Sequence, residues 1–401
     1  MITIGIRLSI KSKLFENLKA VVVHNIAFES YYGPECALLD FLKREKVVSL
    51  LYIQHPLPPF YIDVSSRAKL YDRGRLISTI KAPSLRFKNL RLLSIYNAVA
   101  TLFLVLSMKT RFHVFIGSDG RNALIGLILR KLGYVKTVVY LSHSYGEFSN
   151  PIVNAFTYCL DRYCARSVDS VWNLSHTLTK IREKQGVLKK RNVWVPVGIH
   201  HEEIRSPAKS PKLNETKKLV YVGVLTPRKG IELIIEAMPA ILDKVSKVEL
   251  LVVGGGPFEG WLKEACIRLS LHNNVRFLGY MDYVKLMEFL PQCHVGLAPY
   301  EPKLDNTAYT TDPLKPKLYM ACGLPVIITD FPETASEVRQ SGAGLVIQYD
   351  KHELVDAVVR LLTDAELFER CSVNAVKVAH KYEWSKIFDR AFYEIFQALT
   401  E

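Results

Sequence analysis

The chain has 401 residues, of which 49% are hydrophobic and 23% are charged, and its formal net charge is +14. This composition excludes a wholly disordered chain and supplies apolar residues for two hydrophobic cores, the number expected at roughly 100 to 200 residues per domain. The seven cysteines contain no CxxC pair, so the pattern excludes a recognisable disulfide framework and predicts reduced thiols in a cytoplasmic protein.

The amino terminus alternates short apolar runs with lysines, a pattern that predicts no signal peptide. The longest apolar stretch, Ile95 to Met108, is shorter than the ~20 residues that a bilayer requires. It therefore predicts a buried helix and no membrane crossing.

Residues 67–111 carry most of the excess charge, with ten basic residues and one acidic residue, Asp72. A basic segment beside an apolar helix is typical of a surface that docks on anionic lipid headgroups, and it can also steer an anionic acceptor. A solvated charged face is the alternative. No recognised nucleic-acid-binding motif accompanies the charge, so nucleic acid is not expected as a partner.

Strands and helices alternate through the first half of the chain, an order that predicts a parallel sheet with helices on both faces. These features predict a Rossmann-like domain over residues 1–205. The predicted strands cover residues 19–24, 47–54, 113–117, 137–143 and 169–175, and the predicted helices cover 35–45, 122–133 and 154–166.

Residues 206–216 are predicted to form a linker, because this part of the chain loses periodicity and gathers proline, serine and charge. The alternation then restarts and predicts a second Rossmann-like domain over residues 217–383. The fold class is therefore α/β, with two doubly wound parallel sheets. The last amphipathic segment, residues 384–401, is predicted to pack back on the first domain.

Three segments of the second domain have the residue types that bind phosphate. Arg228 and Lys229 stand where a helix begins, and a helix amino terminus attracts anions. Gly254 to Gly256 follow a strand, where backbone can approach a ligand. Lys315 and Lys317 precede or open another helix. Solvated lysines and an ordinary glycine turn are the alternatives.

The order of GVLTPRKG, VVGGGP, VRFLGY, HVGLAPY and DPLKPKLYMACGLPVI resembles the donor domain of GT-B glycosyltransferases, specifically the family-four retaining group (glycosyl transferases group 1). The resemblance spans about residues 217–382. It implies two Rossmann-like domains that face a central cleft, a nucleotide sugar as the donor substrate, and no metal or other cofactor. It also implies a set of donor-binding residues: Gly223, Arg228, Lys229, Gly255, Gly256, Tyr280, Lys315 and Lys317.

The chain departs from the family pattern at several positions. Thr310 and Leu318 stand where members commonly carry two glutamates, and Val224 stands where many carry an arginine. Asp119 stands where relatives place a histidine that touches the donor sugar; it either orients a sugar hydroxyl or caps the following helix. Asp312 is expected to contact the transferred sugar in place of the missing acids.

The predicted catalytic residues are therefore Asp119, Asp312 and Lys229, and no metal ligands are expected. The residues predicted to line the acceptor side are His24, Gly33 and His143, which lie near strand ends in the first domain.

The predicted function is transfer of a sugar from a nucleotide sugar to a lipid-linked, glycan or small-molecule acceptor, with retention of configuration. The predicted location is the cytoplasm, with peripheral attachment to the inner membrane face through residues 67–111. Two alternatives remain: a non-catalytic GT-B partner protein, which the missing glutamates favour, and a nucleotide-sugar epimerase of the same fold.

Overall fold

In the computed structural model the chain forms two compact units. Unit 1 contains Met1–Pro196 and Ile387–Glu401, and unit 2 contains Val197–Lys386. The structure describes residues 15–26, 33–56, 65–83, 90–143, 151–200, 202, 216–227, 229–302, 311–331 and 333–400. Arg228, Thr310 and most of the predicted linker lie outside the described residues.

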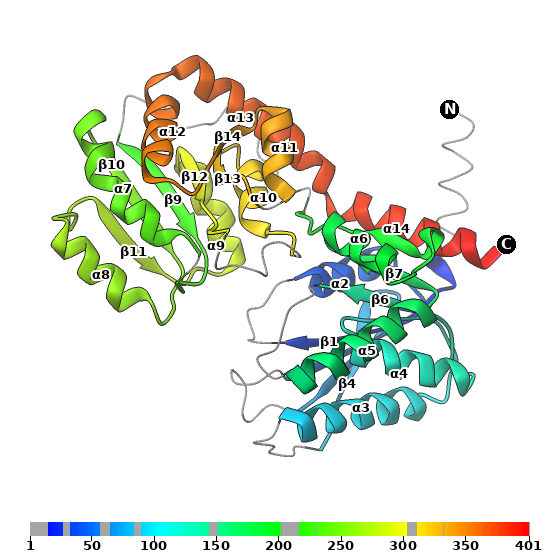
Figure 1. Ribbon diagram of the computed structural model, residues 1–401. Helices are drawn as coiled ribbons and strands as arrows, with labels where there is room; N and C mark the ends of the chain where they lie inside the picture. Colours follow the sequence, from blue (N-terminus) through cyan, green and yellow to red (C-terminus); the bar gives the residue numbers. More distant parts are fainter. Residues whose placement is uncertain are drawn as a thin grey trace, which may run out of the picture. The chain divides into compact units, whose positions relative to one another are not determined.

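Unit 1 is built on one eight-stranded sheet with the strand order β4-β3-β2-β1-β5-β6-β7-β8 (Figure 1). The strands from β2 to β8 in this order are parallel, as the alternation predicts, whereas β3 is antiparallel to both of its neighbours. The strands are β1 (Lys19–Ile26), β2 (Ser49–Pro56), β3 (Arg67–Asp72), β4 (Arg75–Lys81), β5 (Phe112–Gly117), β6 (Val135–Ser142), β7 (Ser170–Asn173) and β8 (Asn192–Trp194).

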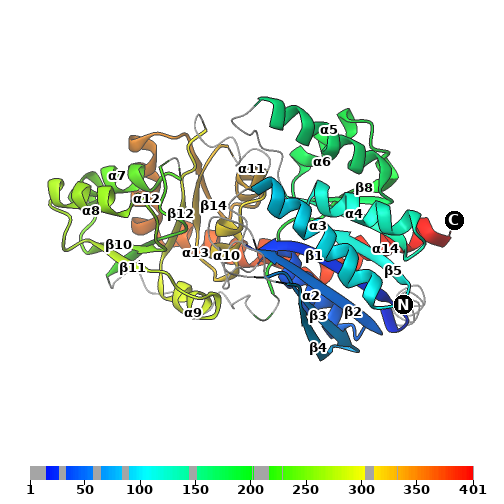
Figure 2. The same cartoon turned by 90° about the horizontal axis from the view of Figure 1, so that it is seen from below.

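Helices cover both faces of this sheet, because alternate residues of each buried strand point to opposite sides. Its helices are α2 (Pro34–Arg44), α3 (Leu90–Ser107), α4 (Gly120–Lys131), α5 (Pro151–Ser167), α6 (His176–Lys184) and α14 (Trp384–Thr400). Val21, Val23 and Phe115 belong to the core shared with α3, α4 and α5, which Figure 2 shows on the near side of the sheet.

The opposite face of the sheet packs against α2 and α14 through aromatic rings. The ring centroids of Trp172 and Phe392 are 5.3 Å apart, and those of Phe41 and Phe388 are 5.4 Å apart. The carboxy-terminal helix therefore contributes Phe388 and Phe392 to unit 1, although Val197–Lys386, which come before them in the chain, belong to unit 2.

The basic segment forms a hairpin that the sequence analysis did not predict. β3 and β4 are joined by Arg73 and Gly74, whose φ angles are +46° and +81°. Two consecutive positive φ angles are typical of the tight turn that matches the twist of an antiparallel pair. Parallel pairing, which the alternation favours, is impossible across so short a connection.

The apolar helix α3 is only partly buried, which corrects the prediction of a buried helix. Leu104 and Val105 are fully buried, whereas Ile95, Val99 and Phe103 are 61%, 58% and 61% exposed. Among the described residues, no helix has both the length and the apolar character needed to cross a bilayer. One side of α3 therefore packs on the sheet while an apolar side meets solvent.

Unit 2 is built on a six-stranded sheet that is parallel throughout, with the order β11-β10-β9-β12-β13-β14. Its strands are β9 (Lys217–Val222), β10 (Val248–Val253), β11 (Val275–Gly279), β12 (Val295–Ala298), β13 (Val326–Thr329) and β14 (Gly344–Ile347). This is the second doubly wound sheet that the sequence predicts.

The helices of unit 2 are α7 (Ile231–Lys244), α8 (Glu259–Arg268), α9 (Tyr283–Phe289), α10 (Leu314–Ala321), α11 (Glu333–Ser341), α12 (Lys351–Thr363) and α13 (Ala365–Ala379). Leu219 and Leu250 share a core with α7, α8 and α12. Val220 and Leu251 share a second core with α9, α10, α11 and α13. Neighbouring residues of one strand thus enter opposite cores, as an alternating strand requires.

Candidate functional site

Three loops of unit 2 meet at the carboxyl edge of its sheet, where open α/β sheets bind ligands. Gly223 follows β9 and its N–H donates to Val253 of β10, while the N–H of Gly254 donates to Gly279 of β11. A Cβ atom on Gly254 would lie 2.0 Å from the carbonyl oxygen of Gly223. Only glycine permits the backbones of these two loops to come so close. The glycines predicted for the donor site therefore lie close together.

Lys315 reaches the same edge from the first turn of α10. Its Nζ atom is 4.2 Å from the ring centroid of Tyr221 and 5.0 Å from that of Tyr300. A Cβ atom on Gly223 would lie 3.2 Å from this Nζ. The ammonium group thus rests between two aromatic faces beside the bare backbone of Gly223, an arrangement that stabilises a cation.

Tyr221, a fully buried residue near the end of β9, connects Lys229 to the ligand-binding edge of the sheet. The Tyr221 hydroxyl donates to the carbonyl oxygen of Lys229 at 3.4 Å. One tyrosine therefore contacts the side chain of Lys315 and the backbone of Lys229, so Gly223, Lys229 and Lys315 lie close together at this edge.

Helix α7 begins at Ile231, and Gly230, its cap residue, follows Lys229. Gly230 has a φ of +81°, and a Cβ atom there would lie 1.6 Å from the carbonyl oxygen of Pro299. A glycine cannot cap with a side chain, so the N–H groups of the first turn keep their attraction for anions. Glu232 also lies in this first turn, and its negative charge would oppose the binding of an anion there.

Tyr280 lies at the rim of this region. It follows Gly279, whose carbonyl accepts from Gly254, and its side chain is 62% exposed. Gly255 and Gly256 are on the adjoining loop, where the carbonyl of Gly255 accepts from the N–H of Leu225 at 3.0 Å. These predicted nucleotide-site residues share the same edge of the sheet.

Lys317 and Asp312 form an ion pair inside unit 2. This contradicts the donor-binding role predicted for Lys317 and the sugar contact predicted for Asp312. Lys317 is 1% exposed; its Nζ is 2.5 Å from Oδ2 of Asp312 and donates to the carbonyl of Val197 at 2.6 Å. Asp312 also accepts from the N–H of Val197 at 2.6 Å, and the ammonium lies 3.9 Å from the ring centroid of Tyr382. Each of the two charges is therefore neutralised by the other within the protein.

Burial perturbs this pair in the expected directions. It raises the pKa of Asp312 and lowers the pKa of Lys317, and the attraction between the two charges offsets only part of each shift. The pair is thus a buried structural ion pair that holds the backbone at Val197, rather than a contact for a sugar or a phosphate.

Two departures from the family pattern can be located. Leu318 is 3% exposed and packs in the core that α10 shares with Val220 and Leu251. Val224 is 59% exposed in the loop after β9. Leu318 therefore contributes to packing.

A second group of polar residues gathers at the carboxyl edge of the unit 1 sheet. His24 is in β1, His143 follows β6, and Gly33 is the residue before α2. Between them lies Glu35, which is 2% exposed and whose Oε1 is 2.8 Å from Nε2 of His143. The structure links the residues predicted for the acceptor side through a glutamate that the sequence analysis missed.

Burial and charge set the protonation of this group. Burial lowers the pKa of His24 to about 4, so the ring is neutral near pH 7. Burial would raise the pKa of Glu35, but the neighbouring His143 and His24 lower it to about 2. Burial alone would lower the pKa of His143, but the carboxylates of Glu35 and Asp119 raise it above its ordinary value. These shifts favour an ion pair between Glu35 and His143.

Asp119 caps α4, which is one of the two roles predicted for it. Its carboxylate accepts from the backbone N–H of Asn122 at 2.7 Å, from the side-chain amide of Asn25 at 2.8 Å and from Arg121 at 3.0 Å. These contacts occupy both carboxylate oxygens, so a direct role in catalysis is not supported by the geometry.

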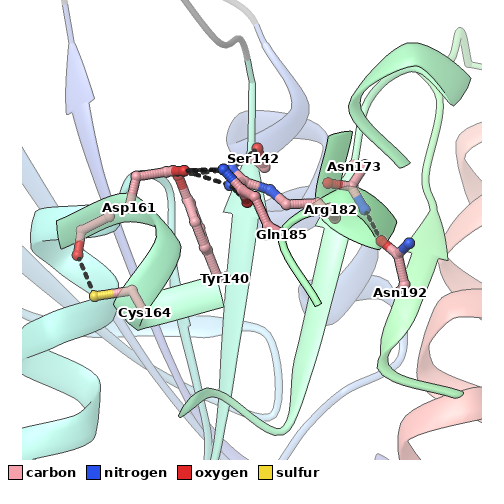
Figure 3. Close-up of polar contacts among 9 residues, drawn as sticks. Tyr140, Ser142, Asp161, Cys164, Asn173, Arg182, Gln185 and Asn192 are labelled. Atoms are coloured by element: carbon pink, nitrogen blue, oxygen red, sulfur yellow. Dashed lines mark hydrogen bonds and ion pairs between the residues drawn. The ribbon is translucent and has the colours of Figure 1, made fainter. Parts of the chain in front are cut away.

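A buried network fixes the end of β6 (Figure 3). Arg182 is fully buried and pairs with Asp161, which also accepts from the Tyr140 hydroxyl at 2.5 Å. Arg182 donates to the Ser142 hydroxyl at 2.7 Å. Because Ser142 precedes His143, the network anchors the strand end that carries this histidine.

Comparison with known proteins gives a family match in the second half of the chain. Residues 216–364 match the family model described as glycosyl transferases group 1. An uncharacterized glycosyltransferase of Methanocaldococcus jannaschii is 30% identical over 179 residues, 43% of each chain. A GDP-mannose-dependent monoacylated alpha-(1-6)-phosphatidylinositol monomannoside mannosyltransferase of Corynebacterium glutamicum is 31% identical over 205 residues, 48% of this chain and 52% of the relative. The matches thus span about half the length of these curated relatives.

The fold extends over nearly the whole chain. Sucrose-phosphate synthase from Thermosynechococcus elongatus has a TM-score of 0.72 with this protein at 17% identity, and the match covers 96% of this chain and 99% of that one. Residues 216–364 are therefore similar to the glycosyl transferases group 1 family, and the chain has the fold of the GT-B glycosyltransferases.

Proposed function

We propose that the protein is a glycosyltransferase whose unit 2 binds a nucleotide-sugar donor, and that it transfers the sugar with retention and without a metal ion. The observation that carries this proposal is the meeting of Lys315 and the Lys229 loop at Tyr221, on the ligand-binding edge of the sheet. This place lies within the segment that matches the family. The mannosyltransferase relative is named for its dependence on GDP-mannose, which supports a nucleoside diphosphate as the leaving group.

Two lysines suit the chemistry of this leaving group. Negative charge builds on the diphosphate as the bond to the sugar breaks, and cations already in place can stabilise it by several kcal/mol in a site that excludes water. In the mechanism we propose, the departing diphosphate oxygen assists deprotonation of the acceptor, so the new bond forms on the face that the diphosphate leaves. The lysines supply the positive charge that a metal ion supplies elsewhere.

A donor screen tests this function. Purified protein is incubated with a panel of nucleotide sugars in excess EDTA, and released nucleoside diphosphate is measured. We expect turnover on one donor, unaffected by EDTA and reduced by about 10²-fold or more in Lys229→Ala, because one preorganised cation at the leaving group is lost. Lys244→Ala, at the opposite end of α7 and 52% exposed, is the matched control. Turnover that requires an added divalent cation would contradict the metal-free proposal.

The non-catalytic alternative has one observation in its favour. Leu318, where the family pattern commonly has a glutamate, is packed in the core and offers no hydrogen bond to a ligand. A protein of this kind would release no nucleoside diphosphate in the donor screen. Calorimetry would still detect binding of a nucleotide sugar.

We further propose a lipid-linked acceptor reached from the cytoplasmic face of a membrane. Ile95, Val99 and Phe103 form an exposed apolar stripe at helical spacing on α3. Arg75 and Lys81 are exposed on β4, in the segment that holds most of the excess positive charge. An apolar stripe with nearby cations suits the interface of an anionic bilayer. The Corynebacterium glutamicum relative is named for a phosphatidylinositol-based acceptor, which supports the same class.

Vesicle sedimentation tests this attachment. The protein is expected to sediment with vesicles rich in anionic lipid and to remain in solution with neutral vesicles, because each cation near the surface contributes about 1 kcal/mol. Val99→Ser combined with Phe103→Ser should weaken sedimentation about tenfold or more, since apolar area no longer enters the interface. The control is Ile267→Ser, which removes a 72% exposed apolar side chain from α8. Equal sedimentation with both vesicle types would remove the support for a membrane acceptor.

A further inference from the structure

The pairing between β9 and β12 ends before either strand does. It covers Val295 and Gly296 of β12, whereas β9 continues beside β10 as far as Val222 and β12 continues beside β13 as far as Ala298. The hydrogen-bond ladder between β9 and β12 therefore stops short of their carboxyl ends. β10 and β11 lie on one side of β9, while β12, β13 and β14 lie on the other. The end of this ladder is thus the topological switch point of the sheet, where open α/β sheets bind ligands.

One side chain occupies the end of this ladder. Tyr319 of α10 is fully buried, and its hydroxyl accepts from the N–H of Val222 at 2.9 Å and donates to the carbonyl oxygen of Leu297 at 3.4 Å. Burial raises the pKa of Tyr319 well above its ordinary value, so the hydroxyl keeps the proton that it donates. A single hydroxyl thus joins β9 to β12 beyond the point where their backbones pair.

The ring of Tyr319 packs directly on the backbone of β12. A Cβ atom on Gly296 would lie 2.3 Å from Cγ of this ring, too close for two atoms that are not bonded. The absence of a side chain at Gly296 therefore lets α10 lie close to the sheet. Because protein interiors are close-packed, α10 cannot shift along β12 without disturbing this contact. The spacing between α10 and the sheet is thus fixed at Tyr319.

Lys315 lies on the same side of α10 as Tyr319, because residues four apart on a helix are neighbours. Its Nζ is 4.2 Å from the ring centroid of Tyr221 and 5.0 Å from that of Tyr300. Tyr221 belongs to β9, and Tyr300 follows β12. The ammonium and the Tyr319 hydroxyl therefore connect the same two strands. A displacement of β9 relative to β12 at this end changes the surroundings of the lysine.

We propose that Tyr319 is a positioning residue of the donor site, and that its hydroxyl holds the ends of β9 and β12 at the distance that places the Lys315 ammonium between two tyrosine rings. This inference rests on the proposed function and adds a residue that acts without touching the ligand. Tyr319 is fully buried, so its effect on sugar transfer passes through Lys315. A displacement of about 1 Å at a reacting group costs about 10²-fold in rate, so the hydroxyl has a large effect at this place.

A double-mutant cycle tests this inference, with the nucleotide sugar that turns over in the donor screen as the substrate. Tyr319→Phe keeps the ring and removes the hydroxyl. We expect kcat/KM to fall about 10- to 100-fold, mainly in kcat, as for Lys315→Ala. In the Lys315→Ala background the same change should cost less than about threefold, because the group that the hydroxyl positions is already absent. Equal losses in both backgrounds, or a single variant within about threefold of the wild type, would overturn the inference.

The control variant is Ser372→Ala. Ser372 is 1% exposed, and its hydroxyl donates to the carbonyl oxygen of Gly323, just after the end of α10, at 2.6 Å. This variant removes a buried hydroxyl bond near the opposite end of the same helix, so its loss of stability in denaturant unfolding should resemble that of Tyr319→Phe. Its kcat/KM should stay within about threefold of the wild type. If Ser372→Ala loses as much activity as Tyr319→Phe, reduced stability explains both results and the inference is wrong.

Acetylation by acetic anhydride gives a readout that does not depend on turnover. The rate at which Lys315 is modified is measured by mass spectrometry against Lys244, which is 52% exposed in the same chain. In Tyr319→Phe this rate should rise about threefold or more, since a cation–π contact is worth a factor of about this size. In Ser372→Ala it should not change. A Lys315 rate unmoved by Tyr319→Phe contradicts the inference. Absence of turnover in the wild type contradicts the proposed function alone, because the labelling still decides whether Tyr319 positions Lys315.

Discussion

Lys315→Ala is expected to lower kcat/KM for sugar transfer by about 10²- to 10³-fold, which corresponds to about 2.7–4 kcal/mol of transition-state stabilisation. Its ammonium is held 4.2 Å from the Tyr221 ring and against Gly223, so it is oriented before a ligand arrives. The loss should fall mainly on kcat, because negative charge on the diphosphate grows as the bond breaks. Single-turnover release of nucleoside diphosphate measures it.

The matched control is again Lys244→Ala, which removes one cation from unit 2 at a solvent-exposed ion pair with Asp356. Such a pair contributes about 0–1 kcal/mol, and its loss should leave kcat unchanged. Retention of more than about a third of wild-type kcat/KM in Lys315→Ala would place the diphosphate elsewhere, since a contact of the proposed kind is worth at least about tenfold.

Asp312→Ala is expected to reduce the free energy of unfolding of unit 2 by about 3–5 kcal/mol, because it leaves the buried Lys317 ammonium without its counter-charge. It also removes the acceptor of the Val197 N–H. The measurement is the midpoint and slope of denaturant unfolding. Asp356→Ala removes an acid that is 67% exposed and should cost less than about 1 kcal/mol.

Two further results decide the role of Asp312. Combining Asp312→Leu with Lys317→Met should recover part of the lost stability, because no unpaired charge remains in the interior. If instead Asp312→Ala unfolds like the wild type but raises KM for the donor, the sugar contact expected from the sequence is restored and the structural role is wrong.

The contrast between Lys315 and Lys317 shows why sequence alone assigned both lysines to one ligand. The two residues are the same type, two positions apart at the start of α10, and both precede the segment typical of the family. Residues two apart on a helix point to nearly opposite sides. Lys315 contacts Tyr221 and Lys317 contacts Asp312 and Tyr382. Only the packing of the helix decides which lysine remains at the ligand-binding edge.

Glu35 was missed for a related reason. An acid after a proline at a helix start is explained fully by local helix preferences, so its sequence neighbourhood gives no sign of another role. Its partner, His143, is far along the chain and comes close only because β1, β5 and β6 are adjacent in the sheet. The alternation of strands and helices predicted both sheets, but it does not give strand order, and strand order decides which loops share an edge.

The alternation of strands and helices along the chain also could not predict the hairpin β3–β4. It departs from the parallel pattern at the end of the sheet, where an antiparallel strand needs only the two-residue turn at Arg73 and Gly74. The helix α3 was predicted, but its exposed apolar stripe was not, because its apolar residues surround the helix and do not reveal which side meets the sheet.

Among the described strands, β4 is the last of the eight-stranded sheet, and an edge strand of this kind can pair with another chain. Leu76 and Ile77 on this strand are 53% and 59% exposed. Arg75 and Lys81 at its two ends place like charges on any second copy that would add edge to edge, and such charges oppose aggregation. The basic residues proposed for membrane attraction are therefore also expected to oppose association between copies of the chain. Charge-reduced variants are expected to self-associate, and their sedimentation must be compared with centrifugation without vesicles.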